Sequence, residues 1–128
     1  MKRALAVVAA LALALALGGW ALHARAARPR ATVEYYYIPG CAVCVRTAAR
    51  LRDVVEPYGA RVALRLIDCT SEEGAAAVER YRFRSHGLAL VDEAGRAQLV
   101  ESDHRVFPEH VAEALDRLMP GGAAVAAR

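Results

Sequence analysis

This 128-residue chain has no excess of positive charge outside its first thirty residues. Five of its 17 basic residues precede position 31, and they are Lys2, Arg3, Arg25, Arg28 and Arg30. The remainder has 12 basic and 14 acidic residues, a formal charge of −2, so the overall +3 comes from the N-terminal segment. Because no basic stripe with interleaved aromatic residues follows, nucleic acid is not expected as a partner.

Cysteine is also scarce, with three in the chain: Cys41, Cys44 and Cys69. An odd number rules out a framework in which every cysteine pairs within the chain. Two of them are separated by two residues, which is the spacing of a redox dithiol or of half a metal site. The length suits one modest domain with its own core, so this pair must act within a single small fold.

Polar and charged residues are absent from Ala4 to Leu22, a run of 19 residues. Lys2 and Arg3 precede it, and a small-x-small site, Ala24-Arg25-Ala26, follows. Residues 1–30 are therefore predicted to be a secretory signal peptide or a membrane anchor. A buried helix of the domain is the alternative, which the lack of a polar face disfavours. We expect the domain to be exported, in the periplasm or another extracytoplasmic space, secreted or anchored to the inner membrane through residues 4–22.

The rest of the chain alternates between strand and helix patterns. The expected elements are a strand at Thr32 to Ile38, a helix at Ala42 to Glu56, a strand at Arg61 to Asp68, a helix ending near Tyr81, strands at Leu88 to Val91 and Ala97 to Val100, and a helix opening at Pro108. Thr70 and Glu73 form a capping box for the second helix. The pattern predicts an α/β domain over residues 31–120, with a four-stranded mixed sheet and flanking helices. The strands at 32–38, 61–67 and 88–91 are expected in its core, and residues 121–128 as an unordered tail.

The two close cysteines occupy different environments in this pattern. Pro39 and Gly40 break the first strand, and Cys41 then stands at the helix N-terminus, where free N–H groups and the helix dipole favour a thiolate. Cys44 shares the apolar stripe of the helix with Ala48, so burial should keep it a neutral thiol. An exposed nucleophile beside a buried resolving thiol is what disulfide exchange requires.

The element order β-α-β-α-β-β-α, with Cys-x-x-Cys at the first strand-to-helix junction, resembles the thioredoxin-like family in its minimal, glutaredoxin-sized form. The resemblance covers roughly residues 32–119. It implies that Cys41 is the attacking thiol, that Cys44 resolves the mixed disulfide, and that the partners are protein or small-molecule thiols and disulfides. No cofactor is implied.

The sequence departs from that family beside the dithiol. Thioredoxins carry a cis-proline at the start of the third core strand, where this chain has Gly87 preceded by His86. We therefore expect a trans peptide and a more open groove there, with His86 and Gly87 binding substrate. His86 would either stabilise the Cys41 thiolate or be a partly exposed loop histidine. The acidic residue usually buried six positions before the first cysteine is Tyr35 here.

Two other functions remain open. Cys41 and Cys44, with Cys69 or His86, could hold Cu(I) or Zn(II), although the sequence fixes no third or fourth ligand, and we assign no metal site. The domain could also be a non-catalytic partner-binding module whose disulfide is structural. Cys69 is expected to be a small buried hydrophobe, with a second redox thiol or a ligand as the alternative.

Overall fold

The computed structural model describes residues 13–15, 19 and 28–122 of the chain. The strands are β1 (Ala31–Tyr37), β2 (Val62–Asp68), β3 (Gly87–Asp92) and β4 (Ala97–Ser102), and the helices are α2 (Ala42–Val55), α3 (Glu72–Tyr81) and α4 (Pro108–Leu118), with short 3-10 helices η1 (Glu56–Arg61) and η2 (Asp103–Arg105). The predicted leader and tail lie almost entirely outside the described residues. Within them, no helix is long and apolar enough to cross a membrane.

The four strands form one mixed sheet in the order β2-β1-β3-β4. β1 runs parallel to β2 and antiparallel to β3, and β4 pairs antiparallel with β3. This confirms the four-stranded mixed sheet, including the hairpin of the last two strands. The expectation that the 61–67 strand lies in the core of the sheet is wrong, because β2 is an edge strand and its Leu66 remains 36% exposed.

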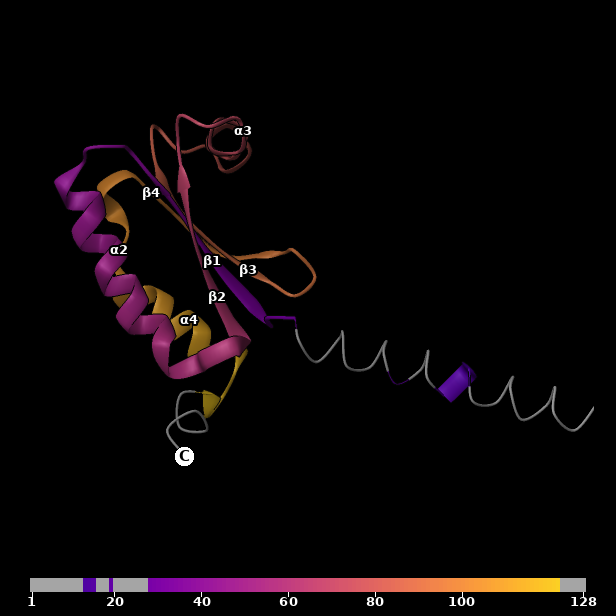
Figure 1. Cartoon of the computed structure of the whole chain (residues 1–128). Coiled ribbons are helices and arrows are strands. Elements are labelled where there is room, and N and C mark those ends of the chain that lie inside the picture. Colours follow the sequence, from indigo (N-terminus) through magenta and orange to yellow (C-terminus); the bar gives the residue numbers. More distant parts are fainter. Residues whose placement is uncertain (1–12, 16–18, 20–27, 123–128) are drawn as a thin grey trace, which may run out of the picture.

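Helices cover both faces of the sheet (Figure 1). α2 and α4 lie on one face and enclose the larger core with residues such as Val33, Tyr35 and Leu88. α3 lies on the other face, over a smaller core that includes Tyr36 and Ala89. Because successive strand residues point to opposite faces, Tyr35 and Tyr36 belong to different cores. The dithiol helix is thus fixed by the larger core.

The start of α3 differs from the predicted capping box. The helix begins at Glu72, and its cap is Ser71, whose hydroxyl accepts a hydrogen bond from the Gly74 N–H at 3.0 Å. Thr70 instead donates from both its N–H and its hydroxyl to the Asp68 carboxylate, each at 2.7 Å. The carboxylate at the end of β2 holds Thr70 in the preceding turn, so the next hydroxyl takes over the cap.

Candidate redox site

The chain turns sharply between β1 and α2. Gly40 has a φ of +78°, a conformation that glycine adopts without steric cost, and the N–H of Cys41 donates to the Ile38 carbonyl at 3.2 Å. The turn makes Cys41 the N-cap residue of α2, with extended backbone angles. The predicted Pro-Gly turn therefore delivers the first cysteine to the tip of the helix.

The sulfur of Cys41 acts as the helix cap. Its Sγ accepts a hydrogen bond from the backbone N–H of Cys44 at 3.1 Å, in the place where a serine or aspartate oxygen usually stands. The pKa of Cys41 lies below its usual value, first because of the Cys44 thiol, then because of the Cys44 backbone N–H, with Arg46 adding a smaller electrostatic contribution. The first turn carries no acidic residue to oppose the charge. Cys41 is half-buried and reaches the surface.

Cys44 has the opposite character. It is 1% exposed and packs in the larger core beside Ala48 and Leu51. Burial, followed by the neighbouring Cys41 thiol, raises its pKa. The directions of both pKa shifts agree with the sequence-based predictions, and they give the pair one thiolate-forming and one thiol-retaining member.

Cys69 lies at the same end of the sheet but on the other face. Its N–H donates to the Tyr37 carbonyl at 2.9 Å, as expected for parallel strands that end together. Its side chain is half-buried against the smaller core on the α3 side. Burial, with Asp68 contributing, raises its pKa to about 11. The predicted role of a small apolar residue fits this packing.

His86 and Gly87 lie at the start of β3. His86 is 3% exposed, so a partly exposed loop histidine is wrong; burial lowers its pKa. Its Nδ1 is 2.9 Å from the Ser85 hydroxyl, and its ring meets His104 edge-on at 5.1 Å. These partners hold the imidazole, and none of the interactions described for it involves Cys41.

The described chain contains no cis peptide, which confirms the trans bond before Gly87. The expected open groove is wrong, because a side chain at Gly87 would lie 2.5 Å from both the Phe83 ring and the Glu101 carbonyl oxygen. That space belongs to the smaller core, since Gly87 faces the α3 side of the sheet. A substrate-binding role for His86 and Gly87 stays a prediction.

Exposed apolar side chains surround the dithiol, a feature that the sequence analysis missed. Ile38, Val43 and Val45 are 36%, 43% and 68% exposed. A cavity of about 140 Å³ adjoins Cys44 itself, and its lining is Tyr37, Cys44, Val45, Ala48, Arg52 and Leu66. The available signal was that Val43 and Val45 fall outside the apolar stripe of α2, where a soluble helix usually carries polar residues.

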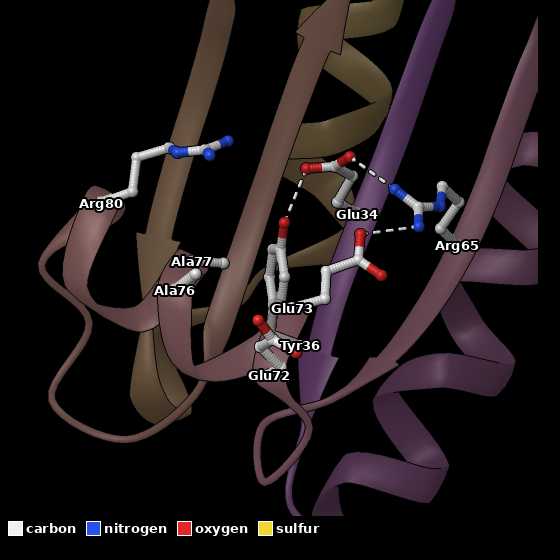
Figure 2. A pocket seen from close by; sticks show the side chains of 8 residues that line it. All are labelled: Glu34, Tyr36, Arg65, Glu72, Glu73, Ala76, Ala77 and Arg80. Carbon is white, nitrogen blue, oxygen red and sulfur yellow. Dashed lines mark hydrogen bonds and ion pairs between the residues drawn. The ribbon is translucent and has the colours of Figure 1, made fainter.

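A second groove lies on the α3 face of the sheet (Figure 2). Arg65 bridges Glu34 at 3.1 Å and Glu73 at 2.7 Å, and the Tyr36 hydroxyl donates to Glu34 at 2.7 Å. These charges satisfy one another within the groove (Figure 2). It is separated from the dithiol by the sheet. In the part of the chain that the structure describes, no three His, Cys, Asp or Glu side chains are grouped to hold a metal ion.

The three thiols should differ in reactivity. In the reduced chain we expect iodoacetamide at pH 7 to modify Cys41 well before Cys44 or Cys69, because alkylation requires an accessible thiolate. The modification rate of Cys41 should rise with pH and reach half its maximum below the pKa of an ordinary thiol, since its thiolate is already stabilised. Peptide mass spectrometry after timed alkylation measures all three rates. Faster modification of Cys44 would contradict the assigned asymmetry.

No protein-family model and no curated protein matches this sequence. Solved structures do match. A thioredoxin-like protein from Clostridium perfringens is 14% identical, with a TM-score of 0.61 over 72% of this chain and 73% of that one. The germline-specific thioredoxin Deadhead from Drosophila melanogaster is 15% identical, with a TM-score of 0.58 over 80% and 94%. A chain in the complex of ferredoxin:thioredoxin reductase with thioredoxin f2 is 17% identical, with a TM-score of 0.54 over 73% and 81%. The described domain has the thioredoxin-like fold.

Proposed function

We propose that this chain is a thiol–disulfide oxidoreductase in which Cys41 attacks and Cys44 resolves. The observation that carries the proposal is the capping bond from the Cys44 N–H to Cys41 Sγ, which stabilises a thiolate at the surface while the second thiol stays buried beside it. The thioredoxin-like fold around a Cys-x-x-Cys pair supports the same role. The exposed apolar side chains at positions 38, 43 and 45 would contact the substrate around its disulfide.

The reaction follows from these positions. The Cys41 thiolate attacks one sulfur of a substrate disulfide, forms a mixed disulfide and releases the other substrate sulfur as a thiolate. Cys44 then loses its proton and attacks Cys41 Sγ, which breaks the bond to the substrate. The second substrate thiolate leaves, and solvent protonates both. The substrate gains two electrons, and the Cys41–Cys44 pair becomes a disulfide. Run in reverse, the same steps oxidise a substrate dithiol.

The partners would be proteins or small molecules that carry thiols or disulfides. The match to a chain crystallised with ferredoxin:thioredoxin reductase supports a protein partner, although that partner belongs to the other protein. We place the reaction outside the cytoplasm, because the apolar run after Lys2 and Arg3 has the composition of an export signal or anchor.

The location can be tested with the full-length chain fused to a reporter that becomes active only after its own disulfides form. Activity in cells, lost when Leu13 and Leu15 are changed to arginine, is the expected result, because charge in the apolar run blocks insertion. Equal activity of the two versions, or recovery of the intact chain from the soluble cytoplasm, would contradict export.

The redox role can be tested by equilibrating the full-length chain with mixtures of reduced and oxidised glutathione. We expect one intramolecular disulfide between Cys41 and Cys44, with Cys69 free, and catalysed reduction of a protein disulfide at a rate set by the chain concentration. Repeating both measurements with Cu(I) or Zn(II) tests the metal alternative. Formation of the disulfide without catalysis would favour a structural bond in a partner-binding domain.

A further inference from the structure

A tyrosine lies behind the dithiol and is buried as deeply as the resolving cysteine. Tyr35, on β1, is 1% exposed, and it packs in the same core cluster as Cys44, which is also 1% exposed. Its hydroxyl interacts by side-chain hydrogen bonding with Cys44 and with Thr47, one turn further along α2. The next residue, Tyr36, points to the opposite face of the sheet and bonds Glu34.

The chemistry of this contact has one direction. Burial, and after it the bond to Cys44, raises the pKa of Tyr35 far above its usual value, so the phenol keeps its proton at any pH where the protein works. A phenol that keeps its proton can donate to a thiolate but cannot remove a proton from a thiol. The Tyr35 bond accordingly lowers the pKa of Cys44, against the larger effect of burial.

Few other groups act on Cys44. The Cys41 thiol raises its pKa, the backbone at Ile38 lowers it, and Cys69 is coupled to it across the sheet. α4 contributes apolar residues to this core, such as Val111 and Leu115, and Arg52 of α2 lines the adjoining cavity. Within the described chain, the Tyr35 hydroxyl is therefore the one side chain that donates a hydrogen bond to Cys44 from the core side.

We propose that Tyr35 is a positioning residue for the resolving step, holding Cys44 Sγ toward Cys41 and stabilising its negative charge as it attacks the mixed disulfide. The inference rests on the proposed oxidoreductase function. Tyr35 keeps its proton throughout. The Cys44 thiolate forms the bond to Cys41 Sγ, the bond from Cys41 to the substrate breaks, and the leaving substrate thiolate is protonated by solvent. A buried thiol can thus ionise when needed without a carboxylate beside it.

The first test is a titration that does not depend on turnover. A full-length chain carrying Cys41→Ser and Cys69→Ala, with carbon-13 at the cysteine Cβ, reports ionisation of Cys44 by its NMR shift. Adding Tyr35→Phe keeps the ring and removes the hydroxyl, and should move the midpoint up by about one pH unit, a tenfold loss of thiolate at a given pH. Tyr36→Phe, on the other face, should leave the midpoint unchanged. An unchanged midpoint in the Tyr35→Phe chain would overturn the proposal.

The second test follows the two chemical steps in the otherwise unaltered chain. With Tyr35→Phe, attack on a substrate disulfide should proceed at the original rate, while the mixed disulfide on Cys41 should decay about tenfold more slowly. Equal decay in both chains would overturn the proposal. If Tyr35→Phe fails to fold, Thr47→Val, which removes the second partner of the phenol, should give a smaller shift in the same direction, and no shift would refute it. If the original chain exchanges no disulfides, the oxidoreductase function fails, and the titration still decides whether Tyr35 acts on Cys44.

Discussion

Replacing Cys41 with serine is expected to reduce disulfide exchange by the full-length chain to the rate of buffer alone. A serine hydroxyl at the tip of α2 would still accept the Cys44 N–H and cap the helix, so the fold should survive. It would not ionise near neutral pH and could not form the mixed disulfide. Reduction of a protein disulfide by glutathione, followed with and without the variant, measures the loss.

The companion variant, Cys44→Ser, should attack normally but fail to resolve, so covalent partners accumulate on Cys41 and are released by added thiol. Cys69→Ala is the matched control, because that thiol is half-buried on the opposite face of the sheet and should leave both rates unchanged. Exchange at the original rate by the Cys41→Ser chain would place the active site elsewhere. Trapping on Cys69 would show that the two thiols had been assigned wrongly.

The fold and the dithiol were predictable because local signals and tertiary packing agree there. The apolar strand, the Pro-Gly break and the stripe of Cys44, Ala48 and Leu51 point to one arrangement, and the larger core contains that stripe. The asymmetry of the cysteines follows from the same pattern, because helix position sets both the exposure of Cys41 and the burial of Cys44.

The remaining features depend on contacts between distant residues. Thr70 and Ser71 are both acceptable caps, and the Asp68 carboxylate decides between them by holding Thr70. His86 is buried because η2 brings His104 beside it, eighteen positions away, which no local pattern encodes. Period-two alternation also gives the same pattern for a strand at the edge of a sheet and one inside it, so the edge position of β2 required the strand order.

The same limit applies to Tyr35. Its place on β1 and its burial were predictable from the strand pattern, but the hydroxyl could have faced any group on α2. Only the packing of α2 against β1 places it on Cys44 and Thr47. The sequence identified a missing carboxylate, whereas the structure identified what its replacement touches.

The largest effect on stability is expected from Gly74→Ala in α3. Gly74 is buried in the first turn of α3, where the helix approaches the end of β2. An added Cβ would overlap the Asp68 carbonyl oxygen and lie 2.7 Å from the Cys69 Cα, both backbone atoms that cannot move aside alone. Overpacking against such a surface costs about 3 kcal/mol, and the better helix propensity of alanine returns about 1 kcal/mol.

The net loss of about 2 kcal/mol should lower the melting temperature by roughly 10 °C, measured by circular dichroism on the reduced chain. Ala75→Gly is the control at the exposed neighbouring position, where propensity alone acts and should cost about 1 kcal/mol. The two substitutions, opposite in chemistry, should therefore both destabilise the domain. Stabilisation by Gly74→Ala would mean that α3 stands further from β2 than this packing requires. The shared backbone at Asp68 and Cys69 would then not fix the sheet end that carries the dithiol.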